Sequence, residues 1–561
     1  MAARSARSTR PARSLARTVA AFAAVGVLAL TACSGSDDAD SSTTEAAGAT
    51  TTTVAPGCEP AEPAAVTATP VVGSVSDLDV VSFDDTVIRA HWFPVAGATP
   101  ESPAPTVLMG PGWSLAGDTD VEATGILGAL DIGTLWEAGF NVMTWDPRGF
   151  GESGGAAQVN SADFEGRDVQ VLIDWVASQP VATLDAEHDP AVGMVGGSYG
   201  GGIQLVVASQ DCRVDAIVPI VAWHSLTTSL FKAETVKTGW ATTLTDVASS
   251  GTVDPHVESA YESGVETGLL SAEDVEWFES RGPGDAVAKI TAPTLIVQGT
   301  VDTLFTLDEG VTNFTILRDA DVPVAMLWYC DGHGVCLTNP GAADRVSTAS
   351  VAWLRRYVAG DTDAALVPVF DVIDQRGVEY SSDDVVIGDG APLTASGGGE
   401  LQLVAEGGAG PLVLPEGFSG ILSGLVEPIT PGIATNSVDV ELAVTDGPHL
   451  VIGAPEVTLT YTGTAGTGDR PQRVFAQLVD DAAGLVIGNQ VTPIEVVLDG
   501  EQHTVTVPLE MIAYSAEPGA TLRLQLVATT VAYAQPQLGG SIDFEQIELS
   551  LPVSESLQRT G

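Results

Sequence analysis

The sequence predicts an α/β domain, built on a doubly wound parallel sheet, followed by an all-β sandwich domain. Between about residues 75 and 358, apolar segments of strand length alternate with segments of helical periodicity, which is typical of a parallel sheet covered by helices on both faces. After about residue 361, short strands with alternating hydrophobicity are separated by Gly, Pro and Asp turns. A chain of 561 residues is too long for a single hydrophobic core, so more than one domain is expected. The hydrophobic content of 45% is sufficient to form the cores of these domains.

The α/β domain is expected to span residues 61–360. Segments that contain predicted strands are, in chain order, 77–95 (an antiparallel pair), 105–112, 141–149, 191–197, 214–223, 293–302 and 323–334. Helices are predicted at 128–140, 162–179, directly after Ser198, and at 344–358. Residues 224–289 lack this alternation and are rich in aromatic residues among helical segments. They predict a cap inserted over the carboxyl edge of the sheet; the alternative is an ordinary crossover helix with long loops.

The second domain is expected to span residues 361–561 as a β-sandwich. Helical patterns nearly vanish here, and strands are predicted at 437–444, 456–463, 503–511 and 521–533. In the last of these, Leu522, Leu524 and Leu526 fall on one face. Such alternation predicts strands with one buried face and one exposed face.

The N-terminus carries the features of a secretion signal. Five Arg residues without an acidic residue precede the apolar run 18–30, which is short for a membrane span, and Leu30-Thr31-Ala32-Cys33 follows. Residues 1–33 resemble a bacterial lipoprotein signal, which implies lipidation of Cys33 and anchoring at the outer face of the cytoplasmic membrane, in the cell envelope. The alternative is an ordinary secretory signal with an incidental cysteine. The Ser/Thr/Ala-rich segment 34–60 predicts a flexible tether.

Charge and cysteine content limit the partners of the protein. A formal net charge of −51 argues against nucleic acid and against electrostatic binding to anionic lipid, so the membrane contact is expected only through the lipid anchor. Besides Cys33, four cysteines remain for an oxidising compartment. Cys330 and Cys336, six residues apart, are predicted to form a disulfide, and Cys58 would then pair with Cys212 by elimination.

A G-x-S-x-G motif marks the candidate nucleophile. Gly196-Gly197-Ser198-Tyr199-Gly200 follows an apolar strand and precedes a helical segment. This context predicts a sharp strand-to-helix turn that presents the hydroxyl of Ser198 at the edge of the sheet. Side chains at the flanking positions would collide, which explains the glycines. Without this context the motif is weak, and the alternative is a tight turn only.

A serine nucleophile needs a base, and the base needs an orienting acid. In sheets of this kind the chain order is Ser, acid, His. Asp302 closes the strand at 293–302, and His333 follows the last strand of the domain, so we expect these two as acid and base; Asp308 is the alternative acid. The oxyanion would be held by the backbone N–H groups of Tyr199 and Trp113. Trp223 and Trp240 are candidates for the substrate pocket, with core packing as the alternative.

Together these motifs resemble a known family of acyl hydrolases. The "DPRGFGESGG" loop (146–155), the serine elbow, the acid and His positions and the trailing β domain resemble the Xaa-Pro dipeptidyl-peptidases and cocaine-esterase-type hydrolases of the α/β-hydrolase superfamily. The resemblance implies an α/β-hydrolase sheet with a helical cap and a C-terminal jelly-roll. It also implies cleavage of a small-molecule or peptide amide or ester through an acyl-enzyme, with no cofactor and no metal. Esterase-type members have a tyrosine where this chain has Gly112.

Two other functions remain open from the sequence. The first is a carboxylesterase or lipase that acts on acyl esters. The second is a surface binding protein built on an inactive hydrolase scaffold.

Overall fold

The computed structural model describes residues 74–122, 130–412 and 429–560, all within one compact unit, Gly57–Gly561. The predicted signal sequence with Cys33 and the predicted tether at 34–60 lie outside these residues and stay predictions. Across the described ranges, every helix is too short or too polar to cross a membrane.

The largest sheet has eleven strands in the order β1-β2-β4-β3-β7-β8-β9-β10-β11-β12-β25. The seven strands from β4 to β11 in this order pair in parallel, and antiparallel strands flank them on both sides. Every residue of β3, β4, β7 and β9 is buried, as expected for strands covered on both faces. The bounds are β1 Ser76–Val81, β2 Val87–Phe93, β3 Thr106–Met109, β4 Asn141–Trp145, β7 Val192–Gly197, β8 Val214–Ile220, β9 Thr294–Gly299, β10 Val324–Tyr329, β11 Phe370–Ile373, β12 Glu379–Ser382 and β25 Gln558–Arg559.

Helices pack on both faces of this sheet. One buried cluster contains residues from α2 (Glu165–Ala177), α3 (Tyr199–Ala208) and α8 (Leu307–Asp319). A second buried cluster contains residues from α1 (Ile132–Glu137) and α9 (Arg345–Tyr357). The two clusters use alternate residues of the same strands, such as Met194 and Val195 of β7, so they lie on opposite sides. A small hairpin, β5 (Leu184–Ala186) and β6 (Asp189–Pro190), precedes β7.

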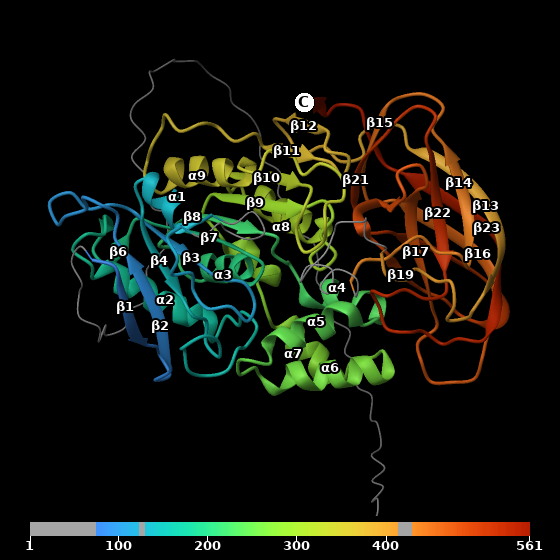
Figure 1. Cartoon of the computed structure of the whole chain (residues 1–561), viewed down its shortest axis with the longest axis horizontal. Helices are drawn as coiled ribbons and strands as arrows, with labels where there is room; N and C mark the ends of the chain where they lie inside the picture. Colours follow the sequence, from blue (N-terminus) through green and yellow to red (C-terminus); the bar gives the residue numbers. More distant parts are fainter. Residues whose placement is uncertain (1–73, 123–129, 413–428, 561) are drawn as a thin grey trace, which may run out of the picture. The chain divides into compact units, whose positions relative to one another are not determined.

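A helical insertion separates β8 from β9, in the stretch for which the sequence predicts a cap. It contains α4 (Leu226–Leu230), η1 (Lys232–Glu234), α5 (Thr238–Ala248), α6 (Pro255–Thr267), α7 (Ala272–Glu279) and η2 (Gly284–Lys289). Local sequence sets the ends of α6, because Asp254 caps its first turn, Pro255 starts it, and Gly268 ends it in the left-handed conformation. Figure 1 shows α4 to α7 (green) gathered below the strands of the sheet. We call these helices, residues 224–289, the cap.

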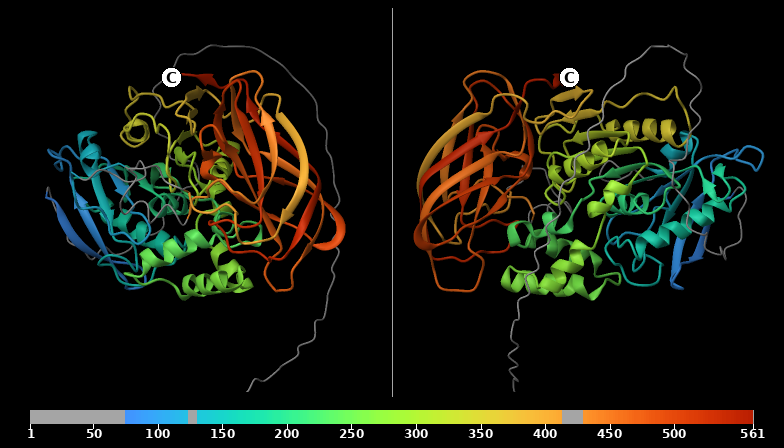
Figure 2. Two further views of the ribbon diagram at one scale, coloured as in Figure 1. Left: turned by 45° about the vertical axis from the view of Figure 1, so that its right-hand side comes forward. Right: turned by 180° about the vertical axis from the view of Figure 1, so that it is seen from behind.

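The C-terminal part of the chain is a large β-rich region. A four-stranded sheet, β13-β23-β16-β20, and a five-stranded sheet of β14, β22, β17, β18 and β19 share one apolar core, and Figure 2 shows them (orange and red) curving around it. A third sheet pairs β21, β15 and β24. The bounds are β13 Leu393–Gln402, β14 Ser437–Ala443, β15 His449–Gly453, β16 Glu456–Ala465, β17 Arg473–Asp480, β18 Leu485–Val486, η3 Ile487–Asn489, β19 Thr492–Glu495, β20 Asp499–Pro508, β21 Ile512–Ala516, β22 Thr521–Val527, β23 Gly540–Leu551 and β24 Val553–Ser554.

The first sheet extends past residue 361, where the sequence predicts the start of the β domain. β11 pairs in parallel with β10, and β12 and β25 continue the same sheet. Phe370 and Val372 are fully buried in the core of this sheet, and the ring of Phe370 lies 5.0 Å from that of Trp328. Short alternating strands look alike in either sheet, because the partner strand is set by packing between residues distant in sequence. β11 and β12 therefore belong to the first sheet although they follow residue 361, and the domain bounds stay predictions.

Candidate active site

Ser198 lies on a sharp turn between β7 and α3. Its backbone has φ 58° and ψ −117°, which a non-glycine residue rarely adopts, and its exposed fraction is 8%. The flanking glycines permit this turn. A Cβ at Gly196 would lie 2.5 Å from the carbonyl oxygen of Gly110, and a Cβ at Gly200 would lie 2.1 Å from the same oxygen. The sequence therefore folds into a strained turn that holds one hydroxyl at the carboxyl edge of the sheet.

The structure brings Ser198, His333 and Asp302 into one chain of hydrogen bonds. His333 Nε2 lies 2.8 Å from Ser198 Oγ, and His333 Nδ1 lies 2.7 Å from Asp302 Oδ2. Asp302 is fully buried and accepts further hydrogen bonds from three backbone N–H groups, those of Leu304, Phe305 and His333. A carboxylate fixed in this way keeps the imidazole proton on Nδ1, which leaves Nε2 able to take the proton of the serine hydroxyl. The alternative acid, Asp308, instead accepts the backbone N–H of Met511.

Two aromatic rings pack edge-on against the imidazole of His333. The ring centres of Trp240 and Phe305 lie 5.7 Å and 5.2 Å from it. The indole N–H of Trp240 donates to Thr303 Oγ1, directly after Asp302 in the chain. Trp240 does not line the cavity described below, so its prediction as a pocket residue is wrong for that cavity. Its N–H holds the ring beside the loop that carries Asp302, a contact between distant residues that the sequence does not reveal.

The β-rich region contacts both loops that carry the acid and the base. Asn489 Nδ2 donates to the carbonyl of Val335 at 3.1 Å, and Gln490 Nε2 donates to the carbonyl of Asp302 at 2.6 Å. A disulfide between Cys330 and Cys336, as predicted, brackets the loop of His333 with a Cα–Cα distance of 5.4 Å. The predicted pairing of Cys58 with Cys212 stays a prediction, because Cys58 lies outside the described residues.

The loop after β3 lies against the start of α3. A Cβ at Gly200 would be 2.9 Å from the carbonyl oxygen of Pro111, so the backbone at residues 110–113 passes close to the serine turn. Within the described ranges, the backbone N–H groups of Trp113 and Tyr199 donate to no protein acceptor. The indole of Trp113 is held separately, because its N–H donates to the carbonyl of Leu244 at 3.0 Å. Tyr199 directly follows Ser198, and the ring of Trp113 lies 5.1 Å from that of Tyr199, while the role of their backbone N–H groups as oxyanion donors stays a prediction.

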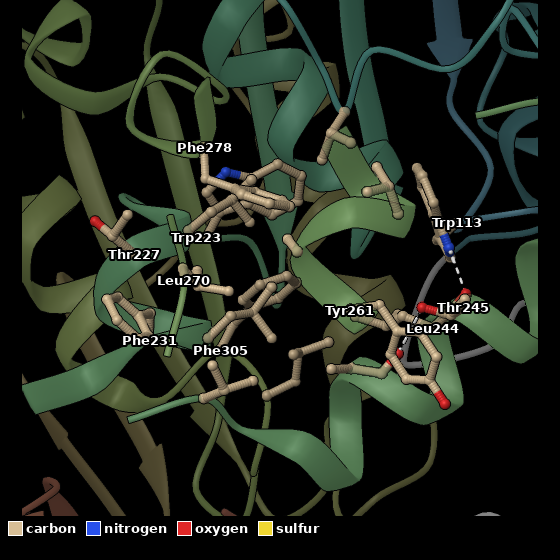
Figure 3. Close-up of a pocket in the computed structure, with 18 of the residues that line it drawn as sticks. Trp113, Trp223, Thr227, Phe231, Leu244, Thr245, Tyr261, Leu270, Phe278 and Phe305 are labelled. Carbon is tan, nitrogen blue, oxygen red and sulfur yellow. Dashed lines mark hydrogen bonds between the residues drawn. The ribbon is translucent and has the colours of Figure 1, made fainter. Parts of the chain in front are cut away.

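A cavity opens at Ser198 beneath the cap. Its empty volume, counting the space open to solvent, is about 890 Å³. Trp223 lines it, as predicted. Figure 3 shows Trp113, Leu244, Thr245 and Tyr261 toward one end and Thr227 and Phe231 toward the other. The full lining is Trp113, Val159, Ser198, Tyr199, Trp223, Leu226, Thr227, Leu230, Phe231, Val236, Ala241, Leu244, Thr245, Val257, Ala260, Tyr261, Leu270, Phe278, Leu304 and Phe305.

A buried carboxyl group lies behind the residue that follows the nucleophile. Glu165 accepts the hydroxyl of Tyr199 at 3.1 Å and the backbone N–H groups of Gln158 and Ser161 at 2.5 and 2.9 Å. Its exposed fraction is 3%, and burial raises its pKa from 4.5 to about 7. Glu165 thereby positions the side chain of Tyr199 below the cavity. Nothing in the local sequence pattern distinguishes it from a surface acid in the first turn of a helix.

Replacing Glu165 by Gln is expected to change how stability depends on pH. The pKa of Glu165 is higher in the folded state, so between pH 4.5 and about 7 the folded state binds more protons than the unfolded state and its stability falls as pH rises. Gln does not titrate. The free energy of unfolding of the wild type minus that of E165Q should therefore decrease as pH rises from 4.5 to 8, as measured by urea denaturation. A difference that stays constant or increases would contradict the prediction.

The described parts of the chain contain no set of side chains arranged as metal ligands. Among these residues there is no group of three or more His, Cys, Asp or Glu side chains arranged to hold a metal ion. The site consists of a serine, an imidazole, a carboxylate and backbone donors.

One family model matches part of the chain. Residues 85–333, the range that contains Ser198, Asp302 and His333, match the model of a family described as X-Pro dipeptidyl-peptidase (S15 family). A curated Escherichia coli sequence, described as an uncharacterized 31.7 kDa protein in the traX-finO intergenic region, is 36% identical over 87 residues. That match covers 16% of this chain and 29% of the relative, so the chain matches less than a third of that protein's length.

Solved structures share the architecture at low identity. An α-amino acid ester hydrolase aligns with TM-score 0.63 at 13% identity, over 87% of this chain and 99% of its own. An aminopeptidase from a marine sediment Thaumarchaeota archaeon gives TM-score 0.61 at 11% identity, over 85% and 96%. A CocE/NonD family hydrolase from Staphylococcus aureus gives 0.60 at 14%, over 85% and 93%. These similarities establish a shared fold, an α/β core joined to a large β-rich region.

Proposed function

We propose that the whole chain cleaves an ester or amide bond through an acyl-enzyme. The premise is that residues 85–333 are a serine hydrolase segment of the X-Pro dipeptidyl-peptidase (S15) family. The observation that carries this proposal is the continuous chain of hydrogen bonds from Asp302 through His333 to Ser198, which ends at the wall of a cavity. A hydrolase of the Xaa-Pro peptidase or acyl ester hydrolase type fits both the family and the cavity.

The proposed mechanism uses only groups of this chain. Ser198 Oγ bonds to the acyl carbon, and its proton passes to His333 Nε2, while Asp302 stabilises the imidazolium through Nδ1. The backbone N–H groups of Trp113 and Tyr199 hold the oxyanion. His333 then gives the proton to the leaving oxygen or nitrogen as its bond to carbon breaks. Water, deprotonated by the same imidazole, attacks the acyl-enzyme and releases the acid and the free serine.

The proposal also covers the fold of the two domains and the location of the protein in the cell. The parallel sheet with the serine turn and cap supports an α/β-hydrolase domain, and the two sheets around one core support a C-terminal jelly-roll. The resemblance of residues 1–33 to a lipoprotein signal supports a lipid anchor at Cys33 and a place in the cell envelope. A membrane fraction that contains the wild type but loses a Cys33→Ser variant would support the anchor.

The test of the enzymatic proposal is labelling with a fluorophosphonate probe, which forms a covalent bond with an activated serine. The wild type should be labelled, and Ser198→Ala should not be labelled and should lose hydrolysis of a panel of acyl esters and Xaa-Pro amides. Ser209→Ala is the matched control, because Ser209 ends the same helix and donates its hydroxyl to the carbonyl of Val206. Labelling of Ser198→Ala at the wild-type level would contradict the proposal.

A further inference from the structure

The lining of the cavity beside Ser198 contains no charged side chain among the described residues. Besides Ser198 itself, polar side-chain atoms come only from two threonines, two tyrosines and the indoles of two tryptophans. The indole N–H of Trp113 is already used, because it donates to the carbonyl of Leu244. The remaining walls are aliphatic and aromatic side chains contributed mainly by the cap. Such a surface binds an apolar group by removing it from water.

Three buried acidic side chains outside this lining, in α2, α7 and α8, already have partners. Glu309 accepts the backbone N–H groups of His224 and Ser225 and the hydroxyl of Thr228. Glu165 accepts the hydroxyl of Tyr199 and two backbone N–H groups, as described above.

Asp274 in α7 is likewise engaged. Its backbone N–H donates to Ser271 Oγ at 3.0 Å, and its carboxylate accepts the hydroxyl of Ser271 at 2.6 Å. Each of these three carboxyl groups belongs to a residue that is at most 4% exposed. An ammonium ion bound in the cavity would therefore lose its water without meeting a carboxylate among the described lining residues.

We propose that the cavity binds the acyl part of the substrate and selects an uncharged, apolar acyl chain, so that the natural substrate is an acyl ester of medium length rather than a peptide with a free N-terminal ammonium. This inference rests on the proposed function, because it assigns the substrate class of the same serine. The acyl carbonyl lies at Ser198, and the chain extends beneath α4, α5 and α6, which contribute nine of the 20 lining residues.

Small residues in these walls offer a way to shorten the cavity. Ala260 in α6 lines the cavity and is 6% exposed, and Ala241 in α5 also lines it. A phenylalanine at either position would occupy space that the proposal assigns to the acyl chain. Val265 is on the same helix as Ala260 and is 46% exposed, so Val265→Phe adds the same ring on the solvent side. It is the matched control for Ala260→Phe.

The experiment measures kcat/KM for p-nitrophenyl acetate and octanoate, and for alanyl-proline p-nitroanilide with a free and with an acetylated amino group. We expect the wild type to favour octanoate over acetate by at least 10-fold and to cleave the free dipeptide amide at least 100-fold more slowly than octanoate. Ala260→Phe, and independently Ala241→Phe, should lower the octanoate value at least 10-fold and leave the acetate value and fluorophosphonate labelling unchanged. Val265→Phe should match the wild type.

Two outcomes would overturn the inference in distinguishable ways. If Ser198 is labelled but the free dipeptide amide is preferred over octanoate and over its acetylated form, the substrate class is wrong and the proposed function stands. The same conclusion follows if either phenylalanine variant lowers acetate and octanoate hydrolysis equally while labelling persists. If Ser198 is not labelled and no substrate is cleaved, the proposed function itself fails.

Discussion

Replacing Asp302 by Asn is expected to lower kcat by about 10⁴-fold, the loss that follows when the acid of a Ser-His-Asp triad becomes an amide. Asp302 Oδ2 accepts from both the ring and the backbone N–H of His333, and Oδ1 accepts from the backbone N–H groups of Leu304 and Phe305. An amide in the same place presents an N–H₂ group to the ring, which favours the imidazole with its proton on Nε2. That nitrogen then cannot take the proton of Ser198. Steady-state hydrolysis of a p-nitrophenyl ester measures the loss.

Asp308→Asn is the control for this prediction, because Asp308 is the other acid that the sequence offers. Its carboxyl is bonded to the backbone N–H of Met511, and burial raises its pKa to about 7, so a neutral amide resembles the protonated acid. Its kcat should remain close to that of the wild type. Equal losses in the two variants would show that the acid assignment is wrong, and a D302N variant with wild-type kcat would show that the imidazole needs no orienting carboxylate.

Much of the site could be predicted because its parts lie at strand ends in a fixed chain order. The serine turn has a local sequence pattern, since its close backbone contacts exclude side chains at Gly196 and Gly200. Asp302 and His333 each follow a continuous apolar strand, and the carboxyl ends of parallel strands lie at one edge. These rules act within a few residues or along one sheet, so a single sequence contains them.

The groups that support the site could not be predicted, because they depend on contacts across long stretches of chain. Gln490 reaches the carbonyl of Asp302 from 188 residues away, and Trp240 packs on His333 from the cap. Neither position belongs to a periodic pattern or a motif. The same reason explains why the sequence did not assign β11 to the first sheet, since only its pairing with β10 places it there. Packing between distant segments decided each of these features.

Replacing Glu510 by Ala is expected to lower the free energy of unfolding by about 3–5 kcal/mol, the cost of leaving the partner of a buried ion pair without its countercharge. Glu510, in the β-rich region, accepts Lys232 Nζ of the cap at 2.8 Å and the hydroxyl of Thr306 at 2.9 Å. Its side chain is 2% exposed and that of Lys232 is 27% exposed. Despite burial, the charges of Lys232 and Lys237 lower the pKa of Glu510 to about 2, so it is ionised at neutral pH.

The charge of Glu510 connects the β-rich region with the cap and with the loop that follows Asp302. Lys237, fully buried in the cap, donates to the carbonyls of Thr303 and Leu304, directly after the candidate acid. Burial lowers its pKa to about 8, and the negative charge of Glu510 opposes that shift. Removing Glu510 would therefore take from both lysines the carboxylate that acts on them most strongly, between the cap and the loop of Asp302.

Chemical denaturation of wild type, Glu510→Ala and Glu501→Ala at pH 7 measures the effect. Glu501 is exposed on β20 of the same region, so its replacement should change stability by less than about 0.5 kcal/mol. A Glu510→Ala loss below about 1 kcal/mol would mean that the two lysines lose little when their countercharge is removed. A full loss would show that the β-rich region does more than cover one side of the site, because its carboxylate then stabilises the cap and the loop that carries Asp302 together.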